Sequence, residues 1–201
     1  MNFNKKIACL SLLILPTIAS ADMLSAAGDA MGNYTLDCPH WYVSGNLGVS
    51  HLYDKQAPGS HDSVNENGPG WNVNGGYQWN SILGGELGYT QYHDSRETKG
   101  GLNIAKTEHY AVHVAATGQY PLANQFSVVG KLGVAYSYAN KIFTASGAAA
   151  ASGSVSPYAA LGVAYSITKK ADFVAQWEGV RGNNYTGSST LYSLGFKFAI
   201  V

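Results

Sequence analysis

Four charged side chains stand out, because each interrupts the uncharged face of a segment in which polar and apolar residues alternate. Two are acidic, Glu86 and Glu178, and two are basic, Lys131 and Lys197. An isolated charge held away from water costs several kcal/mol, so such groups need partners of opposite charge. We expect these four residues to form a buried ion-pair network, with Glu86 paired to Lys197 and Lys131 paired to Glu178. Such a network could act as a gate, or it could simply fill the interior.

Histidines supply the other candidates for chemistry. His109, His113, Ser137 and Asp94 are the parts from which a lipid-cleaving enzyme could be assembled, since ester cleavage needs a nucleophile, a base and an orienting acid. Neither His109 nor His113 begins a His-x-Ser signature, and the two histidines have no third type of metal ligand nearby. We therefore expect no enzyme activity, no metal and no cofactor.

The elements that must position these residues are segments with a period of two. One face of each segment is apolar and aromatic and the other is polar, which is the pattern of a strand between two environments. The last strand is the clearest, while Val174 interrupts the alternation of the seventh. The eight predicted strands are His40–Tyr53, Trp71–Trp79, Leu83–Tyr92, Glu108–Tyr120, Gln125–Tyr138, Val155–Ile167, Asp172–Val180 and Ser189–Val201.

Short and long connections alternate between these strands. The short turns are predicted at Asn80–Ile82, Pro121–Asn124 and Thr168–Ala171, and the long loops at Asp54–Gly70, His93–Thr107, Ala139–Ser154 and Arg181–Ser188. This alternation is typical of an up-and-down transmembrane barrel. Only a closed sheet or a helix satisfies every backbone group in lipid. The sequence therefore predicts an all-β fold, an eight-stranded antiparallel up-and-down transmembrane β-barrel, with a soluble sandwich as the alternative.

The N-terminal residues carry the features of an export signal. Lys5 and Lys6 precede the apolar run Ile7–Ile18, and Ala19–Ala21 supplies small residues for cleavage. We expect residues 1–21 to be a signal peptide, 22–39 a periplasmic lead-in and 40–201 the barrel domain. Cleavage would remove Cys9 and leave Cys38 without an internal disulfide partner, as a free thiol or an intermolecular link.

Short motifs spread along the chain resemble the transmembrane domain of the OmpA family. They are Trp41-Tyr42, Leu47–Ser50, Gly75–Gln78, Asn80, Gly84, Glu86, Gly88-Tyr89, Tyr120-Pro121, Leu132-Gly133, Val155–Pro157, Gly162-Val163, Tyr165, Ile167-Thr168 and Ser193–Gly195. The resemblance implies a structural barrel whose lumen is crossed by ion pairs, with Glu86 matching a glutamate of an internal gate. Two basic positions of that gate are occupied by Thr117 and Val174 here, whereas a third still holds a basic residue, Lys131. We therefore expect a network with different partners.

The resemblance also suggests partners and a location. We expect an outer-membrane protein of a Gram-negative bacterium, present as a monomer surrounded by lipid and lipopolysaccharide. The last residues, Gly195–Phe198 and Ile200, resemble the signal read by the barrel-insertion machinery, with Val201 as a deviation. OmpA continues into a peptidoglycan-binding domain; this sequence stops at the eighth strand, so we expect no cell-wall tether.

The functional expectation follows from composition and size. The net charge is zero and only 12% of residues are charged, which argues against nucleic acid as a partner. Eight strands enclose an interior that side chains can fill. We expect a structural, surface-exposed outer-membrane barrel that contributes to membrane integrity, with adhesion to host-surface ligands through its loops. The alternative is a narrow gated pore for ions or small solutes, and a lipid-modifying enzyme is the third hypothesis.

Overall fold

The computed structural model describes residues 38–53, 63–65, 67–99, 102–123, 125–143, 149–182 and 187–200. The predicted signal peptide and all of the lead-in except residues 38 and 39 lie outside these ranges, so both stay predictions. No helix in the described ranges is long and apolar enough to cross a membrane.

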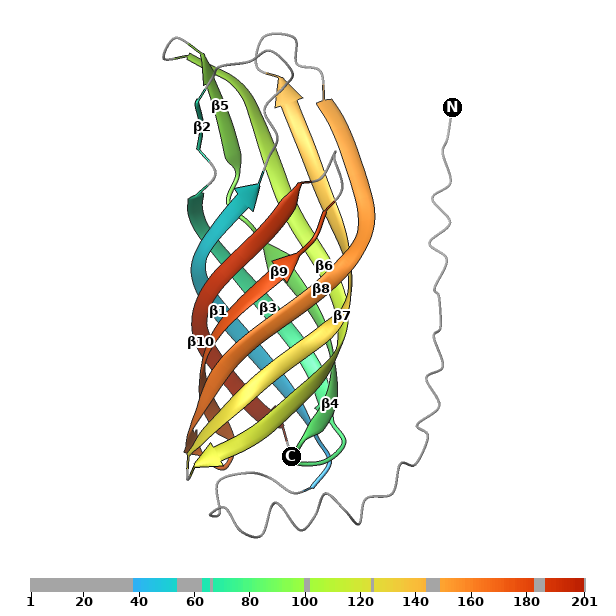
Figure 1. The fold of residues 1–201 in the computed structure, drawn as a ribbon, viewed down its shortest axis with the longest axis vertical. Coiled ribbons are helices and arrows are strands. Elements are labelled where there is room, and N and C mark those ends of the chain that lie inside the picture. Colours follow the sequence, from blue (N-terminus) through green and yellow to red (C-terminus); the bar gives the residue numbers. More distant parts are fainter. Residues whose placement is uncertain are drawn as a thin grey trace.

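The described residues form ten antiparallel strands, and eight of them close into a ring. The strands are β1 (His40–Tyr53), β2 (Ser63–Asn65), β3 (Asn67–Gln78), β4 (Leu83–Gln91), β5 (Ser95–Lys99), β6 (Leu102–Ala123), β7 (Phe126–Phe143), β8 (Ala149–Thr168), β9 (Ala171–Val180) and β10 (Ser188–Ile200). The ring order is β6-β4-β3-β1-β10-β9-β8-β7, and pairing of β6 with β7 closes it (Figure 1). The predicted eight-stranded barrel is confirmed.

The barrel wall separates an apolar outer face from a polar inner face. Trp41, Leu47 and Leu132 project outward and are 63–73% exposed, whereas Glu86 and His113 are buried. A water-soluble protein has the opposite arrangement, with apolar side chains inside and charges outside. The structure thus confirms the predicted alternation, which lipid around the wall and polar packing within it explain.

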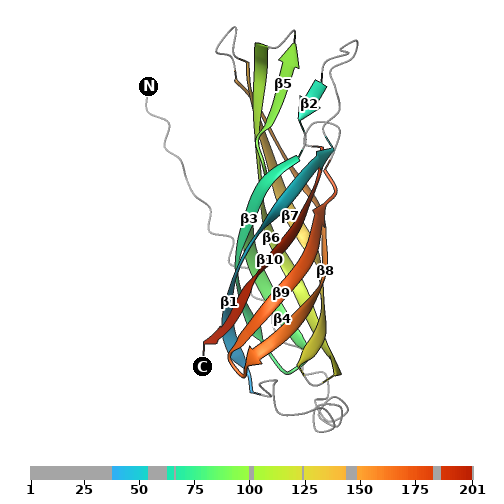
Figure 2. The ribbon, with the colours of Figure 1, turned by 90° about the vertical axis from the view of Figure 1, so that its left-hand side faces the viewer.

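Three strands run further toward the long-loop end than predicted. β6, β7 and β8 extend beyond the barrel rim, and β5 and β2 pair beside β6, as the upper part of Figure 2 shows. Segments predicted as the loops 54–70, 93–107 and 139–154 therefore contain strand, although residues 144–148 lie outside the described part. Beyond the membrane both faces of a sheet meet water, so the hydrophobic alternation fades while backbone pairing continues.

Candidate functional site: charged clusters in the lumen

Glu86 is the centre of a polar cluster that crosses the lumen. The Lys131 ammonium donates to both carboxylate oxygens of Glu86, at 2.7 and 2.9 Å. The Tyr42 hydroxyl donates to Oε2 at 3.0 Å, and Nε2 of His113 lies 3.3 Å from Oε1. The four residues come from β1, β4, β6 and β7. Glu86 therefore joins strands from different sides of the barrel in one charge-assisted network.

Lys131, rather than Lys197, is thus the partner of Glu86, and both predicted pairs are wrong. Residues at equal distances along the chain from the short turns lie at the same height only if the strands run parallel to the barrel axis. In a barrel tilted by 35–45°, each step to a neighbouring strand changes the height of a hydrogen-bonded row by roughly 3 Å. Lys131, Ala160 and Glu178 occupy one such row. Two strand steps separate Lys131 from Glu178 by roughly 6 Å along the axis.

Glu178 forms a second cluster, and its contacts are all with neutral groups. Its Oε1 accepts from the Thr90 hydroxyl at 2.7 Å, and its Oε2 accepts from the Asn72 amide at 2.9 Å. The Tyr158 hydroxyl and the Gln176 amide each donate to Oε2 at 3.3 Å. The side chain is fully buried, and no ion pair of Glu178 occurs in the described part of the chain. Four donors match the acceptor capacity of one carboxylate.

His113 and Tyr158 connect the two clusters. Their rings stack at a centroid distance of 4.0 Å and an interplanar angle of 8°. His113 contacts Glu86 on one side, and Tyr158 donates to Glu178 on the other. Gly88 makes this possible, because a Cβ there would collide with the His113 ring. One continuous set of contacts therefore runs between the two carboxylates.

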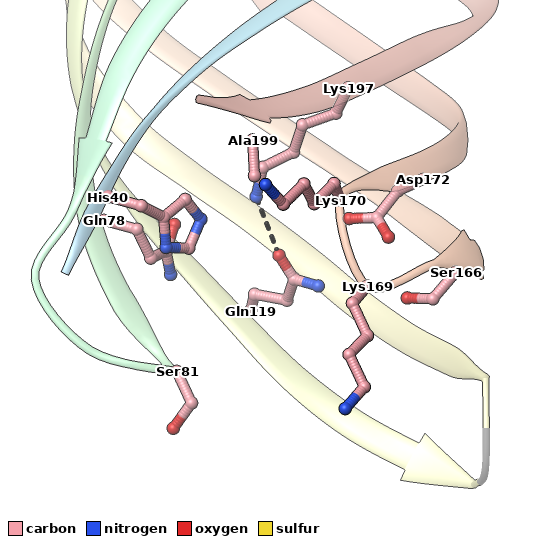
Figure 3. A pocket seen from close by; sticks show the side chains of 10 residues that line it. All are labelled: His40, Gln78, Ser81, Gln119, Ser166, Lys169, Lys170, Asp172, Lys197 and Ala199. Carbon is pink, nitrogen blue, oxygen red and sulfur yellow. Dashed lines mark hydrogen bonds between the residues drawn. The ribbon is translucent and has the colours of Figure 1, made fainter. Parts of the chain in front are cut away.

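Lys197 lies at the short-turn mouth of the lumen, shown in Figure 3. Its ammonium donates to Oε1 of Gln119 at 2.9 Å and lies 4.4 Å from the centre of the Tyr42 ring. The mouth holds a cavity of about 30 Å³, which Lys169, Lys170 and Asp172 also line. Lys197 therefore belongs to the entrance and not to an ion pair with Glu86.

The long-loop end of the lumen is closed by apolar side chains. Leu52, Leu191 and Tyr92 are at most 2% exposed and belong to one buried cluster. The remaining members of that cluster are Ala111, Ala115, Ala135, Tyr158, Ala160 and Val180. Leu52, Leu191 and Tyr92 thus form an apolar plug toward the outside, and the rest of the cluster reaches down to the glutamates, where Ala115 pairs with Glu86 and Ala160 with Glu178.

The residues considered for catalysis or metal binding lie on β6 (His109 and His113), on β7 (Ser137) and just after β4 (Asp94). His113 directs Nε2 to Glu86 and stacks on Tyr158, while Asp94 follows the end of β4 outside any strand. Ser137 is buried opposite Ala111 on β6. Among the described residues, no group of three or more potential ligands is close enough to hold a metal ion.

The sequence prediction missed the neutral partners of both carboxylates. Tyr42 and Tyr158 occupy inward-facing positions of their strands, where a buried tyrosine needs a partner for its hydroxyl. That inward position was the available signal, because tyrosines such as Tyr53, Tyr120 and Tyr192 are exposed on the outer face. Gly76 supplies room for Tyr42, since a Cβ there would collide with the phenol ring.

Comparison with known proteins places this barrel in a family. Residues 37–181 match the model of the OmpA-like transmembrane domain. This chain belongs to that family. Outer membrane protein A of Serratia marcescens is 34% identical over 140 residues, which are 64% of this chain and 39% of that protein. The chain therefore spans about two fifths of the length of this curated relative, and its location in the outer membrane follows from the family.

Solved structures with this architecture include other small outer-membrane barrels. Neisserial surface protein A superposes with a TM-score of 0.58 at 19% identity, covering 80% of this chain and 97% of that one. Ail, the attachment invasion locus protein of Yersinia pestis, gives a TM-score of 0.56 at 14% identity, covering 82% and 100%. At these identities, the likeness to both proteins establishes the fold.

Proposed function

We propose that this OmpA-like barrel is a structural, surface-exposed protein that stabilises the outer membrane and does not conduct. The filling of its lumen carries the proposal. From the short-turn end upward, the axis meets Lys197 with Gln119, then Glu86 with Lys131, then Glu178 and finally the apolar plug. An ion entering from either end would have to displace side chains at several levels.

The size of the internal spaces supports this proposal. The cavity beside Glu86 and Lys131 measures about 20 Å³, and the one at the mouth measures about 30 Å³. A single water needs roughly 10–15 Å³ measured in this way. Each space therefore accepts one to three waters, which fits a hydrated but blocked interior better than a diffusion pore.

Single-channel conductance of the mature protein, refolded into a planar bilayer, tests the proposal. We expect no discrete openings from the wild type or from Glu86→Ala, because the Glu178 cluster and the plug still close the lumen. Leu87→Ala is the matched control, since Leu87 is the next residue and faces lipid. Discrete openings that change with Glu86→Ala and not with Leu87→Ala would favour the gated pore instead.

The sheet beyond the rim favours adhesion as an accompanying function. β6, β7 and β8 carry ordered backbone past the ends of β4 and β9, so the protein presents a structured surface outside the membrane. Replacing residues 139–154 by a short turn should leave the barrel folded and abolish adhesion of expressing cells to host cells. Heat-modifiability on a gel checks folding, and unchanged adhesion by a folded variant would remove this part of the proposal.

A further inference from the structure

The sheet that extends beyond the barrel rim has two side edges, and they differ. On one side, β5 pairs with β6 from Ser95 opposite Thr107 to Lys99 opposite Leu102, and β2 covers β5 in turn. On the other side, β8 pairs with β9 only from Tyr158 onward. Within the described residues, the segment Ala149–Ser156 therefore has β7 as its one neighbouring strand. In Figure 1 this upper part of β8 forms the outline of the molecule.

The direction of the free backbone groups follows from one hydrogen bond. The Arg181 amide donates to the Pro157 carbonyl at 3.2 Å, so the backbone of Pro157 faces the side of β9. In an antiparallel strand the N–H and C=O of one residue point to the same side, and this side alternates along the chain. Val155, Gly153 and Ala151 therefore direct their N–H and C=O groups toward the open side of β8.

In the part of the chain that the structure describes, this edge lacks the features that normally protect an edge strand. Natural edges are blunted by lysines, prolines, bulges or covering segments. Residues 151–156 read Ala-Ser-Gly-Ser-Val-Ser, without charge or proline, and their pairing with β7 shows no register shift. The first proline, Pro157, stands at the rim, where β9 already begins to cover the strand.

The two faces of the edge differ in chemistry. Val155 is 73% exposed on the outer face, and the Tyr136 ring lies over Gly153 beside it. The inner face carries serines, and the hydroxyls of Ser154 and Ser156 are 3.0 Å apart. A strand added here would place its alternate side chains against an apolar patch on one face and hydroxyls on the other.

We propose that the β8 edge, residues 151–156, binds an extended, uncharged peptide segment of a surface partner by strand addition. Main-chain hydrogen bonds to Ala151, Gly153 and Val155 supply the affinity in this mode, and the alternating faces supply selectivity for apolar and hydroxyl side chains. The inference rests on the proposed surface role and names the partner's chemistry. It does not depend on whether the lumen conducts.

Val155→Pro tests the edge, because it removes one outward N–H and leaves the hydrogen bonds to β7 in place. The probe is a fluorescent heptapeptide of alternating threonine and valine, titrated against the protein in lipid nanodiscs by anisotropy. We expect binding to the wild type and a loss of about tenfold or more with Val155→Pro, since a proline removes a donor and crowds the added strand. Val155→Thr keeps the N–H and should bind like the wild type.

A second pair of probes isolates the backbone interaction. The same heptapeptide N-methylated at alternate residues cannot donate along one edge, and we expect no binding from it. Equal binding of the methylated and unmethylated peptides, or of the wild type and a folded Val155→Pro, overturns the proposal. The proposal is also overturned if no peptide binds and the protein forms a dimer that Val155→Pro dissociates, because the edge would then pair with a second copy of this chain.

The adhesion assay separates this inference from the proposed function. Adhesion lost on replacing residues 139–154 but retained with Val155→Pro would overturn the edge as the adhesive element and leave the surface role standing. Loss of adhesion with both variants, together with peptide binding in nanodiscs, is the result expected here.

Discussion

Glu86 and Glu178 are two buried carboxylates in the same lumen, and the barrel accommodates them in different ways. Glu86 is in contact with the Lys131 ammonium, the Tyr42 hydroxyl and the His113 ring. Glu178 is surrounded by amides and hydroxyls, without a cation within ion-pair distance in the described residues. One carboxylate is compensated by charge and the other by a full set of neutral donors.

The difference between the clusters concerns what remains after a partner is removed. A charge pair deprived of one member leaves a single buried charge, which costs far more than the pair contributed. A carboxylate with four neutral donors loses only one of several bonds when one donor is removed. We therefore expect the Glu86 cluster to be the more sensitive of the two to single substitutions.

The largest effect should come from Lys131→Met. The substitution leaves Glu86 buried without its ammonium partner, and we expect it to lower the free energy of unfolding by about 3–5 kcal/mol. Equilibrium unfolding in urea, with the protein in lipid vesicles, measures it. Glu86→Met combined with Lys131→Met is the control, because removing both charges should restore stability to within about 1 kcal/mol of the wild type. A double variant as unstable as the single one would show that packing, rather than charge, causes the loss.

Glu178→Gln should have a smaller but clear effect. The glutamine keeps the shape and offers one acceptor oxygen to four donors, and its amide hydrogens point at groups that donate. We expect a loss of about 1–3 kcal/mol, the cost of leaving buried donors unpaired, measured in the same unfolding experiment. Unchanged stability would mean that Glu178 already carries a proton in the folded barrel, since glutamine mimics the neutral acid.

The barrel itself was predictable because lipid imposes a strict pattern on each strand. β1 (His40–Tyr53) has the predicted boundaries, and the apolar residues that alternate along β10 (Ser188–Ile200) are exposed on the outer face, as the period of two predicts. The alternation is lost outside the membrane, where lipid no longer contacts the strands. Beyond the membrane, β6 begins at Leu102 rather than at the predicted Glu108, and Leu102 and Ile104 are all that remains of the apolar alternation there.

The lumenal residues were predictable as a set, whereas their partners were not. The alternation of inward and outward positions along each strand correctly predicted that Glu86, Lys131 and Glu178 lie inside the barrel. Partner choice depends on the height of each residue along the axis, which strand tilt and stagger fix over the whole ring. A single strand's sequence does not contain that information. Whether the clusters gate a path is a separate hypothesis that the conductance experiment tests.

The smallest effect is expected from Lys197→Met, although the sequence ranked this lysine beside Lys131. Lys197 is half-buried at the mouth, where it donates to Gln119 and lies over the Tyr42 ring. Loss of these contacts should cost about 1 kcal/mol, again by urea unfolding. Gln119→Leu combined with Lys197→Met should cost little more than the larger single effect, because the two groups serve each other. A loss of about 3–5 kcal/mol from Lys197→Met alone would instead mean that Glu86 depends on Lys197 as it does on Lys131.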